Sequence, residues 1–137
     1  MATAPLILLI DGNQEDRNYY TQLLRISSPE FVVLHATTGQ SGLALCTRQS
    51  IDCVVLELDL PDMSGFEVLL KLLPHVQHPE IAVVILTRLA NHYLWEAAIK
   101  IGAQAALYKG MASGDILNKA ILQAISTIQM ERFRLAI

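Results

Sequence analysis

The feature that most constrains this chain is an alternation between short, continuous apolar runs and longer stretches with helical spacing. The apolar runs cover residues 6–10, 31–34, 53–56, 81–86 and 105–108. The helical stretches cover residues 16–26, 39–48, 64–73, 91–101 and 113 to about 135. Runs that are apolar throughout are typical of strands buried on both faces. Five successive strand–helix units predict an α/β domain with a parallel sheet and helices on both of its faces.

Size and charge narrow the classes of protein to consider. The 137 residues, 53% of them hydrophobic, are enough for one domain with a substantial core. The formal net charge is −3 without a basic stretch, which argues against direct binding of nucleic acid. No apolar run approaches the roughly 20 residues of a membrane span, and the uncharged start of the chain is too short for a signal peptide. We therefore expect a cytoplasmic protein that does not contact a membrane.

Polar residues follow four of the predicted strands, namely Asp11, Glu57, Thr87 and Lys109. Because the carboxyl ends of parallel strands meet at one edge of a sheet, we expect these side chains to converge there. Two carboxylates can hold a divalent cation, while an ammonium and a hydroxyl can bind an oxyanion. The set is typical of a site for phosphoryl transfer.

With these residues in place, the chain resembles the receiver domain of two-component response regulators from about residue 6 to residue 129. The resemblance lies in Leu-Ile-Leu-Leu-Ile-Asp ending at Asp11, Leu-Pro-Asp-Met-Ser-Gly ending at Gly65, Val-Val-Ile-Leu-Thr ending at Thr87, Gly102-Ala and Leu-Tyr-Lys ending at Lys109. It implies a doubly wound, flavodoxin-like fold with five parallel strands in the order 2-1-3-4-5. It also implies a Mg²⁺ site after the first and third strands and an aspartate there that accepts a phosphoryl group.

The phosphorylation site departs from the family pattern at two positions. Aligned on Pro61 and Gly65, the acceptor position holds Glu57, and Gly12 stands where the family has a second metal-binding acid. The extra methylene of a glutamate moves its carboxylate by more than about 1 Å, and a misplacement of that size costs on the order of 10²-fold in rate. The missing acid weakens the cation site, because ligand charge sets much of its affinity. We expect a domain that is not phosphorylated in the usual way.

Glu57 also has the reach to act as a partial mimic of a phosphorylated aspartate, by extending toward Lys109 and Thr87. The mimicry is incomplete because a phosphoryl group brings about −1.5 to −2 charges, against −1 for a carboxylate. Three further positions differ from the family pattern. Arg88 follows Thr87 where a small residue is usual, Gly110 replaces a proline, and Ala106 replaces a switch aromatic, although Tyr108 stands nearby.

Other interpretations of the same acids stay open. If the third strand extended further, Asp59 would compete with Glu57 as acceptor of a phosphoryl group in an ordinary phosphorylatable receiver. In the preferred register the metal site consists of Asp11, Glu57 and Asp59, and Mg²⁺ binds weakly or not at all. The resemblance implies that Asp59 contributes its backbone carbonyl to this site, which leaves its side chain solvated. Asp16 and its neighbour Glu15 could replace the lost ligand, but acids in the first turn are favoured by the helix dipole alone.

A third interpretation is a flavodoxin-like binding protein for an anionic small molecule. It is disfavoured because the acidic segment after the first strand lacks a glycine-rich phosphate loop. Beyond residual phosphoryl transfer or self-dephosphorylation, we do not expect enzymatic activity. The expected partners are signalling proteins, either a kinase or an output domain.

The fourth predicted helix suggests an interaction surface. At 100° per residue, Leu94 and Ala98 face the sheet, whereas His92, Trp95 and Ile99 point outward. An exposed tryptophan beside an isoleucine is typical of an interface, and the alternative is a tryptophan ring that lies flat against neighbouring helices. The resemblance implies a surface made by the fourth helix, the fifth strand with Tyr108, and the fifth helix. This surface could support a homodimer.

The last predicted helix, over residues 113–135, is long enough to project beyond the sheet. Leu117, Ile121, Ala124 and Ile128 follow 4-3-4 spacing, which favours packing on the sheet, and Glu131 interrupts the pattern. We expect residues 1–137 to form a single receiver-like domain whose last helix leads to a further output module outside this chain.

Overall fold

The computed structural model describes residues 4–74 and 81–137 and confirms the predicted α/β class with a five-stranded parallel sheet. Its elements are β1 (Leu6–Ile10), α1 (Gln14–Ser27), β2 (Val32–Ala36), α2 (Gly39–Arg48), β3 (Cys53–Leu56), α3 (Gly65–Leu72), β4 (Ala82–Thr87), α4 (His92–Ile101), β5 (Ala105–Tyr108) and α5 (Gly114–Ala136). The strand order is β2-β1-β3-β4-β5, as the resemblance implied, and every neighbouring pair is parallel. This order places the carboxyl ends of β1 and β3 side by side.

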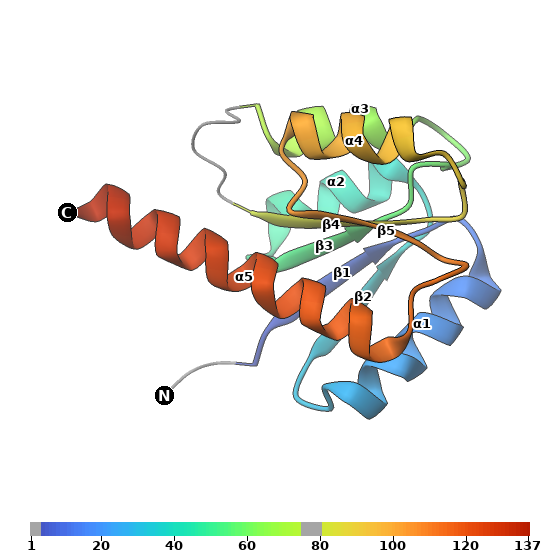
Figure 1. Cartoon of the computed structure of the whole chain (residues 1–137), viewed down its shortest axis with the longest axis horizontal. Helices are drawn as coiled ribbons and strands as arrows, with labels where there is room; N and C mark the ends of the chain where they lie inside the picture. Colours follow the sequence, from blue (N-terminus) through green and yellow to red (C-terminus); the bar gives the residue numbers. More distant parts are fainter. Residues whose placement is uncertain (1–3, 75–80) are drawn as a thin grey trace.

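Helices cover both faces of the sheet, with α1 and α5 on one side and α2, α3 and α4 on the other (Figure 1). Successive residues of a strand point into opposite layers. In β1, Ile7 and Leu9 join the core beneath α1 and α5, whereas Leu8 and Ile10 join the core beneath α2, α3 and α4. This burial on both faces is why the predicted strands are apolar throughout rather than alternating.

The start of α1 differs from the prediction in a way that affects the edge of the sheet. The helix begins at Gln14, two residues before the predicted residue 16, because the Asn13 side chain caps it by accepting a hydrogen bond from the Asp16 N–H at 2.9 Å. Asp16 therefore lies in the first turn of the helix, next to the carboxyl end of β1.

At the far end of α4, Gly102 adopts a φ of 131°, a conformation that favours glycine and ends the helix.

Helix α5 packs on the sheet through its first half and continues beyond the sheet in its second half (Figure 1). The four residues predicted to pack are all buried, namely Leu117, Ile121, Ala124 and Ile128. From residue 129 onward the helix is mostly exposed, including Met130, Phe133 and Leu135. Within the part of the chain that the structure describes, no helix combines the length and the apolar character needed to cross a bilayer.

Candidate functional site

The structure brings the four predicted strand-end residues to one edge of the sheet. Asp11 and Glu57 directly follow β1 and β3, Thr87 is the last residue of β4, and Lys109 directly follows β5. Sheet hydrogen bonding continues through these positions: the Asp11 amide donates to Ala36 O at 3.0 Å, and the Lys109 amide donates to Thr87 O at 2.8 Å. The side chains are therefore fixed by the strands rather than by loops. Glu57 and Thr87 are almost fully buried, at 2% and 0% exposed.

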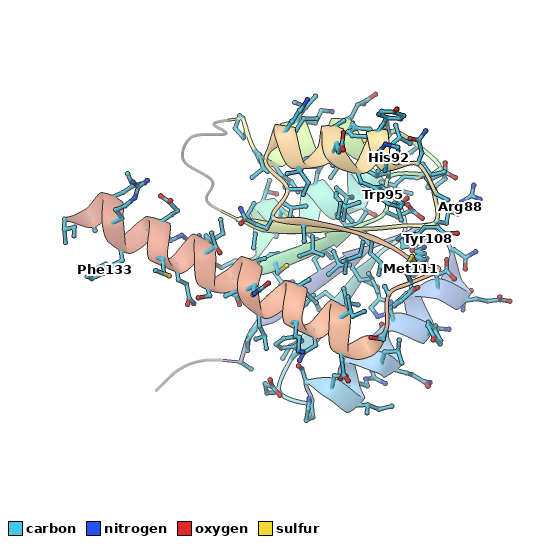
Figure 2. All side chains as sticks on the ribbon, in the orientation of Figure 1. Arg88, His92, Trp95, Tyr108, Met111 and Phe133 are labelled. Atoms are coloured by element: carbon cyan, nitrogen blue, oxygen red, sulfur yellow. The ribbon has the colours of Figure 1, made fainter. Side chains whose placement is uncertain are left out.

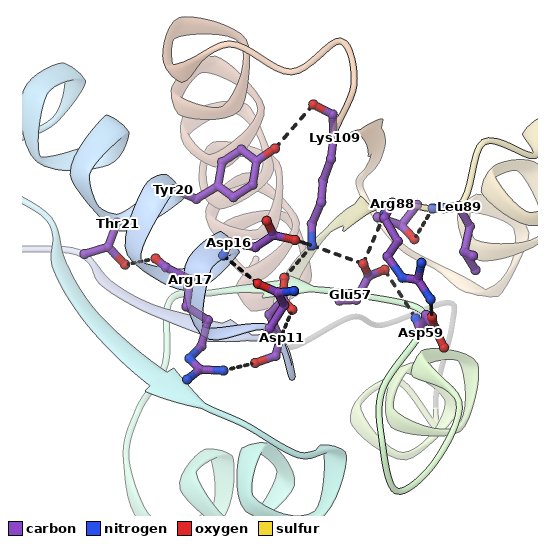
Figure 3. A network of polar contacts seen from close by, with 12 residues as sticks. Asp11, Asp16, Arg17, Tyr20, Thr21, Glu57, Asp59, Arg88, Leu89 and Lys109 are labelled. Atoms are coloured by element: carbon purple, nitrogen blue, oxygen red, sulfur yellow. Dashed lines mark hydrogen bonds and ion pairs between the residues drawn. The ribbon is translucent and has the colours of Figure 1, made fainter.

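The ammonium group of Lys109 lies at the centre of three carboxylates (Figure 3). Its Nζ contacts Asp11 Oδ2 at 2.6 Å, Asp16 Oδ2 at 2.8 Å and Glu57 Oε1 at 3.1 Å. Asp16 is a member that the sequence interpretation missed, because its place in a first helical turn was explained by the helix dipole. Asp11, Asp16, Glu57 and Lys109 together form the carboxylate cluster.

The environment of Lys109 changes its titration. Burial lowers the pKa of the ammonium, but hydrogen bonds to Asp11 and Asp16, with attraction from Glu57, outweigh burial and raise that pKa above its ordinary value. The side chain is only 9% exposed, so water competes weakly for these contacts. Lys109 is therefore charged throughout the physiological range and holds the carboxylates together.

Both oxygens of the Glu57 carboxylate have partners. Besides Lys109, Oε1 accepts a hydrogen bond from the Arg88 amide at 3.0 Å, and Oε2 accepts one from the Asp59 amide at 3.2 Å. We expected Glu57 to extend toward both Lys109 and Thr87. It contacts Lys109, whereas the Thr87 hydroxyl accepts a hydrogen bond from the Leu89 amide at 3.1 Å. Glu57 is thus bonded to the backbone of the loop after β4 rather than to the threonine side chain.

Asp59 and Arg88 form a second ion pair above the cluster, and their side chains are 41% and 64% exposed. The attraction raises the pKa of Arg88, first through its hydrogen bond to Asp59 and then through the charge of that residue. The sequence interpretation had Asp59 solvated in the preferred register and did not assign Arg88 a partner. Because Arg88 follows Thr87 directly, its guanidinium reaches across the mouth of the site. A cleft of about 370 Å³ lies here, bordered by Gly12, Pro61 and Arg88.

Two glycines near the site, Gly12 and Gly65, lie so close to the end of β3 and the segment after it that a side chain there would clash. A Cβ atom at Gly65 would lie 2.6 Å from both Glu57 O and Leu58 Cα, so only glycine permits this close approach to the end of β3. The Gly65 amide also donates to Leu58 O at 2.8 Å. A Cβ atom at Gly12 would lie 2.9 Å from Pro61 Cδ. An acid at position 12 therefore requires the proline to move.

The residues that the resemblance assigns to Mg²⁺ do not fit a divalent cation in this arrangement. Asp11 and Glu57 neutralise the Lys109 ammonium, Asp59 is paired with Arg88, and position 12 offers no carboxylate. Over residues 4–74 and 81–137, no group of three or more histidine, cysteine or acidic residues is arranged to hold a metal ion. The lysine supplies the positive charge among these carboxylates.

The predicted interface residues lie on α4 and β5 (Figure 2). His92 and Ile99 are exposed, as the helical wheel suggested, and Ala98 is fully buried against the sheet. Trp95 is half-buried rather than outward-pointing. Its ring stacks on Tyr108 with centroids 5.8 Å apart, and its Nε1–H donates to Leu89 O at 2.8 Å. This position is closer to the alternative of a ring packed on its neighbours, because β5 and the preceding loop offer it a stacking partner and a carbonyl.

Two curated response regulators are sequence relatives of this chain. The chain is 33% identical over 118 residues to the nitrate/nitrite response regulator protein NarL of Escherichia coli (strain K12), covering 86% of this chain and 53% of that protein. It is 26% identical over 128 residues to the transcriptional regulatory protein SrrA of Staphylococcus aureus (strain NCTC 8325 / PS 47), covering 92% of this chain and 51% of that protein. The chain thus spans about half the length of these curated relatives.

Solved structures agree with the sequence relatives. The signal receiver domain of an HD domain-containing protein from Pseudomonas fluorescens Pf-5 superposes with a TM-score of 0.84 at 27% identity, covering 98% of this chain and 96% of that one. A response regulator receiver domain protein from Clostridium thermocellum gives a TM-score of 0.79 at 30% identity, covering 97% and 99%. The family described as the response regulator receiver domain matches residues 7–121. The chain therefore belongs to the receiver domain family of two-component response regulators.

Proposed function

We propose that this receiver is an interaction module in which Glu57 and Lys109 hold one fixed arrangement without phosphorylation of the usual kind. Receiver domains are generally signalling modules rather than enzymes, and they typically bind Mg²⁺ weakly. The supporting observation is the state of Glu57: its side chain is 1% exposed, and both carboxylate oxygens have partners. A carboxylate must expose an oxygen to attack a phosphorus atom, and these contacts must break before Glu57 can do so.

Charge leads to the same proposal. Phosphoryl transfer to a receiver requires a positive centre that neutralises the incoming oxygens. Here the Lys109 ammonium is already shared among Asp11, Asp16 and Glu57, so the four side chains carry a net charge of −2. A phosphodonor approaching this edge meets a negative cluster. In the proposed function, Glu57 supplies the contact to Lys109 permanently, as a partial substitute for a phosphorylated aspartate.

Intact-protein mass spectrometry tests this proposal. The protein is incubated with Mg²⁺ and a small phosphodonor, and its mass is compared with that of Glu57→Asp and of Glu57→Asp combined with Gly12→Asp. We expect the natural chain to gain no phosphoryl group, because neither the acceptor nor the cation site has the required geometry. The double variant should be labelled, since it restores both acids, although the side chain introduced by Gly12→Asp must displace Pro61.

Labelling of the natural chain would refute the proposal. Peptide mapping then distinguishes Glu57 from Asp59, with Asp59→Asn as the matched control that keeps the size of the side chain. A label on Asp59 would establish the ordinary phosphorylatable receiver as the correct alternative. A lack of labelling in the double variant, together with a natural chain that binds Mg²⁺ in a calorimetric titration, would also count against the proposed role of Gly12.

The proposed partners are signalling proteins, a kinase or an output domain, in a cytoplasmic two-component system. The candidate surface is a groove of about 470 Å³ on α4 and β5, lined mainly by His92, Trp95, Ile99 and Ala106. Its apolar floor and charged rim are typical of protein interfaces. The same surface could pair two copies of the chain, and an output module could follow α5 in a longer protein. In the curated relatives, about half the length lies outside the matched region.

A further inference from the structure

Lys109 lies at the end of an edge strand, where the sheet provides only part of its support. Its amide donates to Thr87 O at 2.8 Å, which extends the ladder between β4 and β5 by one bond. The amide that would come next, at Leu89, donates to the Thr87 hydroxyl at 3.1 Å instead. The ladder therefore ends here, and the Lys109 carbonyl needs a partner from another element.

Helix α1 supplies this partner through Tyr20. The tyrosine hydroxyl donates to Lys109 O at 3.3 Å (Figure 3). Its ring is buried in the core beneath α1 and α5, and burying a phenol hydroxyl is costly unless it is hydrogen-bonded. Burial also raises the pKa of Tyr20, so the hydroxyl keeps its proton and remains a donor.

The same helix holds the other end of Lys109. Asp16 lies one turn before Tyr20, and residues four apart lie on the same face of a helix. The Asp16 carboxylate contacts Lys109 Nζ at 2.8 Å through Oδ2. Figure 3 shows the lysine extended between these two residues of α1. One face of α1 thus bonds both the main chain and the ammonium group of Lys109.

Helix α1 is itself attached to the end of β1, so it provides a firm support. The Arg17 guanidinium donates to Asp11 O at 2.6 Å through Nη1, and the Asn13 amide donates to Asp11 Oδ1 at 2.8 Å. The other oxygen of that carboxylate, Asp11 Oδ2, contacts Lys109. The first turns of α1 and the lysine are therefore positioned by the same strand end.

We propose that Asp16 and Tyr20 are positioning residues through which α1 holds both ends of Lys109 and directs its ammonium to Glu57. Without such contacts, the flexible stem of a lysine at a strand end adopts many rotamers and extends its charge into solvent. The inference rests on the proposed function, in which Glu57 and Lys109 hold one fixed arrangement, and assigns the residues that maintain it. It is tested through the chemistry of the lysine and without a phosphodonor, so its failure is distinguishable from failure of the proposed function.

Trace labelling with acetic anhydride measures the reactivity of each lysine in the folded protein. The neutral amine attacks the anhydride, acetate leaves and the nitrogen loses a proton, so a charged or enclosed lysine reacts slowly. Peptide mass spectrometry compares Lys109 with the exposed lysines Lys71, Lys100 and Lys119 in the same sample. We expect Lys109 to react at least about tenfold more slowly than these lysines, because its contacts raise its pKa above the ordinary value.

Asp16→Asn keeps the size of the side chain and removes its charge. It should increase the reactivity of Lys109 about tenfold at pH 8, the factor that corresponds to one pKa unit. Repeating the labelling at increasing pH should show the whole Lys109 profile displaced to lower pH, a change that general loosening of the fold does not produce. Glu15→Gln is the matched control, because it removes an exposed acid from the same helical turn and should leave Lys109 unchanged.

Tyr20→Phe keeps the buried ring and removes only the donor to the Lys109 carbonyl. A distance of 3.3 Å is long for a hydrogen bond from a hydroxyl, so we expect a smaller increase in reactivity, about threefold. Tyr19→Phe is the matched control, because the Tyr19 ring is exposed beside it. Far-ultraviolet circular dichroism verifies that each variant is folded.

Two results would overturn the proposal. One is a folded Asp16→Asn protein in which Lys109 keeps its natural reactivity and pH profile. The other is an equal increase at Lys109 in a variant and its matched control, which would show that the effect is not specific to the contact. If Asp16→Asn does not fold, the comparison of Tyr20→Phe with Tyr19→Phe decides alone.

Discussion

The two ends of the sheet use opposite chemistry. At the carboxyl end, the buried carboxylates of Asp11 and Glu57 and the half-buried carboxylate of Asp16 all contact Lys109. Toward the amino end, helix α5 extends beyond the sheet and leaves apolar side chains exposed, with Met130 70% and Phe133 69% exposed (Figures 1 and 2). At these two ends of the sheet, burial therefore does not follow polarity. The contacts at the carboxyl end hold its side chains in one arrangement. The turns of α5 beyond the sheet contribute little to the stability of the fold, and their apolar side chains are accessible to another chain.

The largest effect should follow removal of the cation at the carboxyl end. Lys109→Met leaves Asp11 and Glu57 buried without a positive partner, and breaking a buried pair in this way costs about 3–5 kcal/mol. Urea unfolding of the variant measures this loss of free energy. Lys119→Met, which removes an exposed lysine from α5, is the matched control and should have little effect. Equal stability of the two variants would mean that the cluster is not a stabilising feature of the fold.

This cluster shows how far a sequence can predict a site. The positions of Asp11, Glu57 and Lys109 follow from where apolar runs end, because strands buried on both faces have clear boundaries. The role of Asp16 does not follow in this way. Its partner Lys109 is 93 residues away in the chain, and the contact exists only once β1 and β5 are placed in one sheet. The helix dipole alone could account for an acid at position 16, so nothing in the sequence indicated an ion pair there.

The fold was more predictable than the side-chain directions on its surface. All five strands and all five helices were predicted, because the order of apolar and polar residues along each element follows from which of its faces is buried. A helical wheel could not choose between an outward and a packed Trp95, because it takes into account the helix axis and not the Leu89 carbonyl or the Tyr108 ring. Arg88 was similarly identified as unusual without its partner Asp59, because the pair joins two loops that meet only at the sheet edge.

The second prediction compares two adjacent residues on α5, within the half that packs on the sheet. Ile121 is fully buried, and Ile121→Ala should cost about 2–5 kcal/mol because it leaves a cavity in the core. Leu122 is 43% exposed, and Leu122→Ala should cost much less. Urea unfolding of the two variants gives the difference directly. Similar losses would contradict the packing of α5 on the sheet and weaken the distinction between its two halves.

The third prediction concerns pH and again tests the carboxyl end. The contacts of Lys109 raise its pKa in the folded protein above the value of about 10.4 in the unfolded chain. Between these two values the unfolded chain binds fewer protons than the folded one, so stability falls as pH rises. The stability advantage of the natural protein over Lys109→Met should be constant between about pH 6 and 9. It should then decrease above about pH 10.4, by up to about 1.4 kcal/mol per pH unit. An advantage that stays constant at high pH would show that the charge of Lys109 is not its source.

The smallest effect on stability should come from the other end of the comparison. Phe133→Ser removes an exposed aromatic ring from the outer turns of α5 and should change the free energy of unfolding by no more than about 0.5 kcal/mol, because the ring packs on little of the domain. If this segment contacts another chain, the same change should reduce self-association in sedimentation velocity at high concentration. Gln129→Ser, which alters a polar residue one turn earlier, controls for a general change in the helix. A loss of stability comparable to that of Ile121→Ala would mean that the outer turns belong to the core, and the contrast between the two ends of the sheet would then disappear.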